Sequence, residues 1–291
     1  MSQSYCHRQS ADAELLMYHS EALNCARCIM TTTDLYDSDV LLDQAHQAQV
    51  KRQYSVAAKF YDQALKKREK ALGDDPSVAQ ILDELGRVYM QGGNYTESER
   101  LFTNALAMAE KCLYPGHALL SPILQNLSEL HIKQEKYAEA EPFAARALEI
   151  NEKTLSGEHR TNLLSILRLG MIQRKLGKQA DAEKTLTKAL KHIDSPLGPL
   201  EEFKYELAML FQEQGKNTES EKAYKESIDG FEYRGNLPRL AECLTSYAGY
   251  LKSNNRAKEA EELLSRAKTA RDLSQDWHHS PDIFPSTLLR A

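Results

Sequence analysis

Hydrophobic and small residues recur in this sequence with a period of 42 residues between positions 85 and 200. The residues that share a place in the period include leucines and alanines: Leu85, Leu127 and Leu169, and likewise Ala105, Ala147 and Ala189. A fixed period of a few tens of residues is typical of stacked supersecondary units. Because each unit can bury its apolar face only against its neighbours, the pattern predicts a repeat protein without a single central core.

Each period contains two stretches with helical spacing of apolar residues, so the pattern predicts six helix pairs. The predicted repeats cover about residues 38–72, 78–113, 119–155, 161–196, 200–232 and 237–273. The turns inside a pair are short and polar, and the links between pairs carry Gly or Pro, which end helices. We expect an all-α solenoid, with an N-terminal helical cap at residues 1–37 and an irregular C-terminal tail at residues 274–291.

Composition and charge restrict the classes of partner. The chain has 37 basic and 42 acidic residues and a net charge of −5, so no basic surface for nucleic acid is expected. No apolar run approaches the roughly 18 residues that span a bilayer, so no membrane insertion is expected either. The N-terminus lacks the apolar region of a secretory signal, and the five cysteines are scattered. Both features favour reduced thiols and a cytoplasmic location.

The repeat carries a recognisable motif. Leu85-Gly86-x-x-Tyr89 is followed by Tyr95-x-x-Ser98-Glu99 and then by an Ala-Leu pair, which resembles the tetratricopeptide repeat (TPR). The 42-residue length, with the segments 64–76 and 147–159, resembles the kinesin light chain subclass. The resemblance covers about residues 39–273 and implies a right-handed solenoid whose first helices line a concave groove. It indicates the fold firmly, whereas the biology varies widely within the subclass.

The resemblance also implies which side chains face that groove. Carried over by position, they are Asp83, Arg87, Gln125, Asn126, Glu129, Lys133, Leu167, Met171, Arg174, Tyr205, Met209 and Gln212. The second and third repeats would present a mixed polar floor. The fourth and fifth would present an apolar patch with a polar rim, as interaction hot spots do. Alternatively, these apolar residues pack against the neighbouring first helix and do not reach solvent; the spacing alone favours neither arrangement.

Two binding modes of the family can be checked against the residues. The clamp for C-terminal carboxylates needs Lys and Asn four residues apart on a first helix, and pairs such as Asp83/Arg87 do not match. Kinesin light chains carry paired asparagines before the signature leucine. Only Asn126 matches here, which argues against cargo binding of the motor type.

Two further sites are weighed against simpler explanations. Cys25 and Cys28 supply soft ligands for zinc, but their place in a helical stretch favours two unrelated cysteines, so neither a metal nor another cofactor is expected. Trp277 follows Asp276, and this acidic-aromatic tail could dock into the protein's own groove. The alternative is that Trp277 covers the end of the last helix pair.

Signatures of enzymes are missing from the sequence. It contains no phosphate-binding glycine loop, no His-Glu-x-x-His helix and no Gly-x-Ser-x-Gly elbow. We therefore predict a non-enzymatic scaffold or adaptor that binds a peptide or helix of a partner protein. The alternatives are a ligand-responsive regulatory or sensor module and a motor-cargo adaptor of the kinesin light chain type.

Overall fold

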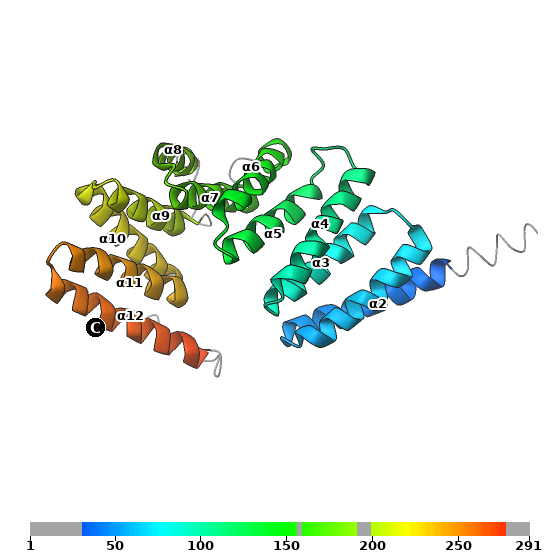
Figure 1. Cartoon of the computed structure of the whole chain (residues 1–291). Helices are drawn as coiled ribbons and strands as arrows, with labels where there is room; N and C mark the ends of the chain where they lie inside the picture. The colour runs from blue at the N-terminus through cyan, green and yellow to red at the C-terminus, as the bar shows by residue number, and fades with distance from the viewer. Residues whose placement is uncertain (1–30, 156–158, 191–198, 278–291) are drawn as a thin grey trace, which may run out of the picture. The chain divides into compact units, whose positions relative to one another are not determined.

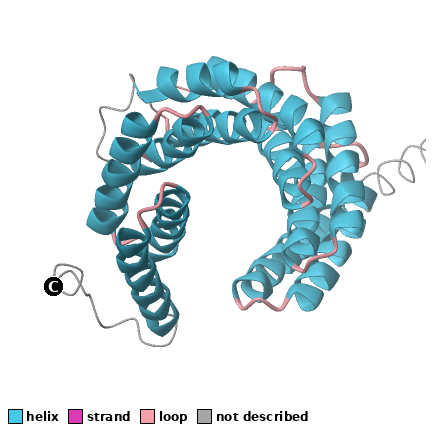
Figure 2. Ribbon diagram, turned by 60° about the vertical axis from the view of Figure 1, so that its left-hand side comes forward, coloured by secondary structure: helices cyan, strands magenta, loops and turns pink. Residues whose placement is uncertain are grey.

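The computed structural model describes residues 31–155, 159–190 and 199–277, and these are helical throughout apart from short turns (Figure 1). No strand occurs in those ranges (Figure 2), which confirms the predicted all-α fold. The Cys25/Cys28 pair and most of the predicted N-terminal cap lie outside the described residues. So do residues 278–291 of the predicted tail.

The chain divides into two compact units, residues 1–134 and residues 135–291. Unit 1 contains a helix over residues 31–50, followed by α2 (Tyr54–Leu72), α3 (Pro76–Gln91), α4 (Tyr95–Cys112) and α5 (Leu120–Lys133). Unit 2 contains α6 (Tyr137–Thr154), α7 (Arg160–Lys175), α8 (Gln179–Leu190), α9 (Leu200–Glu213), α10 (Asn217–Arg234), α11 (Leu237–Ser253) and α12 (Ala257–Trp277). The first helix is unbroken at residues 37 and 38, and α12 continues past residue 273. The division into cap, repeats and tail stays a prediction.

The turn inside each helix pair uses one residue with a left-handed backbone. Gly93, Gly177 and Gly215 take φ values of 81°, 73° and 72° at this place. In the other pairs the same place is taken by residues with a side chain: Arg52, Glu135 and Asn255, with φ of 56°, 59° and 61°. Glycine adopts this conformation without strain, whereas other residues do so at some cost. The turn geometry therefore recurs even where the sequence does not supply glycine.

Small residues let the two helices of a pair approach closely. In the pairs that lie within one unit, the second helix carries alanine or serine at one fully buried place: Ala57, Ser98, Ala182, Ser220 and Ala260. Where serine stands there, its hydroxyl donates to a carbonyl of the first helix, 2.8 Å from Ser98 Oγ to Gly86 O and 2.9 Å from Ser220 Oγ to Ala208 O. Opposite, a Cβ added to Gly86 would lie 2.7 Å from the ring of Phe102.

Aromatic residues fill the core of unit 2 between α9, α10 and α11. Tyr224 stacks on Tyr247 with ring centroids 4.9 Å apart, and Tyr205 meets Phe231 edge to face at 6.5 Å. Burial raises the pKa of Tyr205 to about 12, so this phenol stays protonated and can donate a hydrogen bond. Such aromatic pairs contribute about 0.5–1.5 kcal/mol each beyond the area that they bury.

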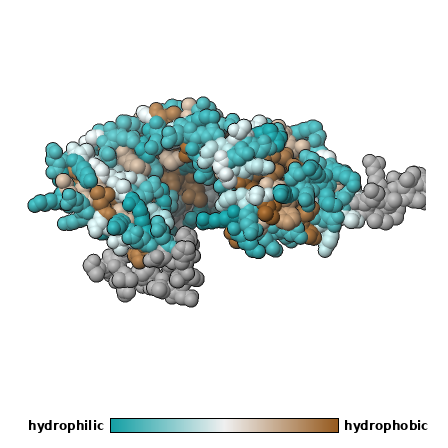
Figure 3. All heavy atoms as spheres, turned by 60° about the horizontal axis from the view of Figure 1, so that its bottom comes forward, coloured by the Kyte–Doolittle hydropathy of each residue, from teal (hydrophilic) through white to brown (hydrophobic). Residues whose placement is uncertain are grey.

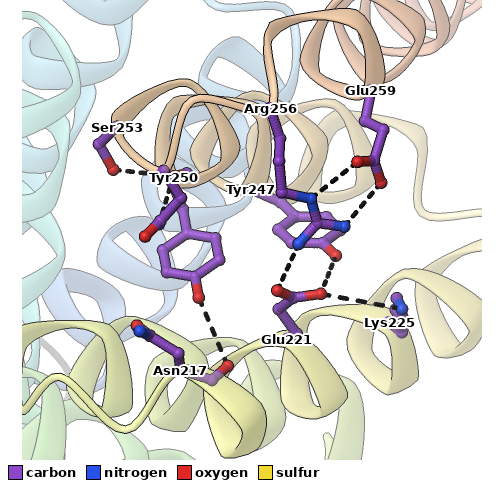
Figure 4. A network of polar contacts seen from close by, with 9 residues as sticks. Asn217, Glu221, Lys225, Tyr247, Tyr250, Ser253, Arg256 and Glu259 are labelled. Carbon is purple, nitrogen blue, oxygen red and sulfur yellow. Dashed lines mark hydrogen bonds and ion pairs between the residues drawn. The ribbon is translucent and has the colours of Figure 1, made fainter.

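Charged side chains at the edge of this core connect successive pairs. Arg256, just before α12, forms ion pairs with Glu221 of α10 and Glu259 of α12 (Figure 4). Glu221 also accepts a hydrogen bond from Tyr247 of α11, at 3.3 Å (Figure 4). One carboxylate thus holds three helices together.

The Arg256–Glu221 ion pair belongs to a series in unit 2. Lys178 pairs with Glu141 at 2.6 Å, and Lys216 pairs with Glu183 at 3.0 Å. In each case the basic residue precedes the second helix of one pair, and the glutamate lies on the second helix of the preceding pair. Partly exposed pairs of this kind contribute only about 0–1 kcal/mol each to stability.

Candidate binding surface on the first helices

The first helices of the pairs carry the residues that the sequence predicts for binding. We call the side chains of α3 and α5 the unit 1 face: Gln80, Asp83, Glu84, Arg87, Gln125, Asn126, Glu129 and Lys133. We call those of α7 and α9 the unit 2 face: Leu164, Leu167, Met171, Arg174, Tyr205, Met209 and Gln212.

The predicted residues differ in exposure. Four are buried, with exposed fractions of 7% for Asp83, 9% for Leu167, 6% for Arg174 and 2% for Tyr205. Two are exposed, Lys133 and Gln212. The other six are half-buried: Arg87, Gln125, Asn126, Glu129, Met171 and Met209. The alternative arrangement, in which the apolar residues pack against a neighbouring helix, therefore holds for two of the four apolar residues. Leu167 and Tyr205 pack inward, and Met171 and Met209 remain accessible.

On the unit 1 face, a buried carboxylate connects two repeats. Asn126 Nδ2 of α5 donates to both carboxylate oxygens of Asp83 on α3, at 2.8 and 3.0 Å. Burial raises the pKa of Asp83 to about 6, although the Asn126 hydrogen bond acts in the opposite direction. Asn126 is the one residue that matches the kinesin light chain asparagines. Its amide nitrogen is engaged with Asp83, so the match gives no support to motor-type cargo binding.

The remaining charges of this face are paired along their own helices. Arg87 forms an ion pair with Glu84 at 3.0 Å, and Lys133 lies 3.8 Å from Glu129. Both pairs are partly exposed to solvent and contribute little to stability. Asp83 differs from Glu84 and Glu129, because its hydrogen bonds come from the neutral amide of Asn126 and not from a cation.

A hollow of about 350 Å³ opens on this face. The helix over residues 31–50 contributes Leu42 and His46, α3 contributes Asp83 and Glu84, and the start of α5 contributes Ile123. Ligand pockets in proteins measure roughly 300–1,000 Å³, so this hollow lies at the lower end of that range.

On the unit 2 face, a buried arginine connects α7 and α9. Arg174 Nε lies 3.1 Å from Glu206 Oε2, and its guanidinium also contacts Glu213 at 2.6 Å. Burial raises the pKa of Glu206, and the charge of Arg174 opposes this effect. The predicted rim residue Arg174 is thus a buried structural cation. Sequence reasoning missed Glu206 and Glu213; their signal is an acidic pair seven residues apart on the next first helix.

Further contacts hold the unit 2 face. Tyr205 and Ser246 share a hydrogen bond of 2.8 Å between their hydroxyls, 41 residues apart in the chain. The guanidinium of Arg239 lies 5.4 Å from the centre of the Tyr205 ring. Gln212 accepts a hydrogen bond of 2.9 Å from Tyr224, twelve residues later. The burial of Tyr205 therefore comes with defined partners on α11.

Figure 3 shows hydrophobic residues in small patches among hydrophilic ones on the surface in that view. Within the described residues, no group of three or more His, Cys, Asp and Glu side chains is placed to hold a metal ion. None of the described helices is both long and apolar enough to cross a membrane.

Comparison with known proteins identifies the family. The family model of the tetratricopeptide repeat matches residues 37–111, 77–153 and 119–193, more than half of the chain. The chain belongs to the tetratricopeptide repeat family. No curated protein matches the sequence.

Several solved structures share this TPR fold. A putative kinesin light chain from Podosopora anserina with nearly identical TPR-like repeats is 22% identical, with a TM-score of 0.61, over 67% of this chain and 95% of that one. The apo form of RapI is 14% identical, with a TM-score of 0.62, over 83% of this chain and 85% of that one. A Rap protein complexed with competence and sporulation factor is 17% identical, with a TM-score of 0.57, over 83% and 68%. At these identities the likeness concerns the fold alone.

Proposed function

We propose that this TPR protein is a non-enzymatic scaffold or adaptor that binds a segment of a partner protein on the unit 1 face or on the unit 2 face. TPR proteins are typically interaction scaffolds. One protein of this fold, a Rap protein, has been solved in complex with competence and sporulation factor. The proposed location is the cytoplasm, which the free thiols of Cys112 and Cys243 support.

The observation that carries the proposal is that side chains of both faces are bonded from one repeat to the next. Hydrogen bonds connect Asp83 with Asn126, Arg174 with Glu206, and Tyr205 with Ser246. Because these buried side chains are already ordered, they fix the positions of the half-buried side chains beside them, and less entropy is lost when a ligand binds there. The half-buried methionines Met171 and Met209 lie on the same face as these hydrogen-bonded side chains. Because methionine side chains are flexible, they suit a binding surface that adapts to its ligand.

Display of a random dodecapeptide library against the full chain tests the proposal. We expect enriched peptides to lose binding to a variant of one of the two faces: Gln80→Arg with Glu129→Arg in unit 1, or Met171→Glu with Met209→Glu in unit 2. These positions are exposed or half-buried, so the variants should fold. Thermal unfolding of each variant checks this.

The matched control places two new charges on a second helix. Ala138 and Ala145 are exposed on α6, and the variant Ala138→Glu with Ala145→Glu should keep the affinity of the wild type. The proposal fails if no peptide is enriched, or if neither face variant weakens the binding of the enriched peptides.

A further inference from the structure

The hollow on the unit 1 face combines apolar walls with a buried carboxylate. Leu42 and Ile123 stand on opposite helices, and Asp83 and Glu84 come from α3 between them. Asp83 is only 7% exposed, yet it lines the hollow. The site therefore offers a low-dielectric environment in which a charge interacts more strongly than at an open surface.

The charge of Asp83 is not balanced by an ion pair, whereas the buried carboxylate of Glu206 is paired with Arg174. Its hydrogen bonds come from the neutral amide of Asn126. Glu84 raises its pKa and Arg87 lowers it, so these two neighbours oppose one another. Arg68, which also lines the hollow, forms an ion pair with Asp39. A buried carboxylate without a cationic partner is unfavourable, and a bound cation would relieve that cost.

We propose that this hollow is a recognition pocket for a basic side chain, lysine or arginine, of the partner segment. The aliphatic stem of such a side chain would lie against Leu42 and Ile123, while its charged end would bind Asp83 and Glu84. Long basic side chains bury their stems in this manner and keep the charged end in a polar environment. The inference rests on the proposed function and adds the chemistry of one residue of the partner.

The size of the hollow supports a side chain as the occupant. A volume of about 350 Å³ is at the lower end of ligand pockets. The remainder of the partner segment would then lie outside the hollow, along the half-buried residues Gln125 and Glu129 of α5. Recognition through one deep residue and a shallow remainder is the usual distribution of binding energy at interfaces.

The first experiment compares peptide selection by the wild type and by Asp83→Asn. The asparagine side chain has the same shape and still offers one oxygen to Asn126, so the substitution removes the charge and one of the two hydrogen bonds from Asn126. We expect the wild type to enrich lysine or arginine at one fixed place, and the variant to lose this preference. Asp62→Asn, an exposed carboxylate on α2, is the matched control and should select as the wild type does.

The second experiment changes the peptide and leaves the protein intact. Replacing the enriched lysine by norleucine, or the enriched arginine by norleucine, keeps an apolar stem and removes the charge. We expect affinity for the wild type to fall by roughly tenfold to a hundredfold, as when a hydrogen bond to a charged group is lost. The same replacement should change affinity for Asp83→Asn by less than about threefold, well under the loss of a charged contact.

The outcomes separate this inference from the proposed function. Peptides that depend on a face variant but show no basic preference would overturn the pocket and leave the scaffold function standing. A basic preference that persists in Asp83→Asn would also overturn it, because general charge attraction would then explain the selection. If no peptide is enriched at all, both proposals fail.

Discussion

Asp83 on α3 of unit 1 and Glu206 on α9 of unit 2 are both buried carboxylates on first helices, but their hydrogen-bond partners differ. Asp83 accepts hydrogen bonds from the amide of Asn126, whereas Glu206 faces the guanidinium of Arg174. An opposite charge compensates a buried carboxylate, and a neutral donor does so only in part. The carboxylate of unit 2 is thus used to fasten α7 to α9, while that of unit 1 keeps charge available for a ligand.

The largest expected effect breaks the compensated site. Replacing Arg174 by Met removes the cation between Glu206 and Glu213 and leaves a buried charge without its partner. Breaking a buried ion pair in this way costs about 3–5 kcal/mol, so unfolding in urea should show a loss of this size. Adding Glu206→Gln to Arg174→Met should recover part of the loss. A cost below about 1 kcal/mol for the single variant would show that the pair does not fasten unit 2.

A second prediction concerns Asp83 and pH. The pKa of this carboxyl in the folded protein is about 6, above the 3.8 of the ordinary group. The folded state therefore binds the proton of Asp83 more tightly than the unfolded state does. The stability that this protonation contributes is present below pH 4 and is lost as the pH rises to about 6.

Removing the ionisable group should abolish this loss. We expect the stability of Asp83→Asn relative to the wild type to increase between pH 4 and pH 6 by up to about 3 kcal/mol, because one pKa unit corresponds to about 1.4 kcal/mol. Urea unfolding at a series of pH values measures the difference. A constant difference across this range would mean that Asp83 titrates like an exposed carboxyl.

The third prediction compares the same framework position in the two units. A Cβ at Gly86 would lie 2.7 Å from Phe102, and one at Gly170 would lie 2.5 Å from Leu186. Overpacking costs about 1–3 kcal/mol, and the better helix propensity of alanine returns up to about 1 kcal/mol. Gly86→Ala and Gly170→Ala should therefore destabilise the protein by similar amounts. Thermal unfolding that shows a large difference would mean that the helix pairs of the two units pack unequally.

The smallest expected effect lies at the exposed ends of the faces. Lys133 on α5 and Lys175 on α7 are exposed at equivalent places in their repeats. Replacing either by leucine should change the free energy of unfolding by less than about 0.5 kcal/mol, as is usual for surface positions. A larger loss for either variant, seen in urea unfolding, would place that lysine in a structural contact.

The helices and their faces could be predicted because they depend on spacing alone. The period of 42 residues places Leu85 and Leu127 at the same point of successive repeats, and both are buried. The serines that replace alanine in the second helices keep a fixed spacing within a pair, since Ser98 and Ser220 each lie twelve residues after the residue whose carbonyl they bond.

The exposure of individual face residues could not be predicted in the same way. Spacing states which side of a helix a residue occupies, but not whether the next helix covers it. Tyr205 is covered because Ser246 and Arg239 reach it from α11. Arg174 is covered because Glu206 and Glu213 of α9 contact it. These partners lie 32 and 39 residues away in the chain, after the link that shortens the period. Contacts across an irregular link leave no periodic signal.

The ion pairs between successive second helices of unit 2 bear on engineering. In every repeat from the third onward a basic residue is followed five positions later by a glutamate, as in Lys178 and Glu183 or Lys216 and Glu221. Glu261 on α12 occupies this place after Arg256. A grafted module whose second helix is preceded by lysine would find a matching carboxylate there. We expect an array that is lengthened by copying one module to form the same ion pair at the new junction.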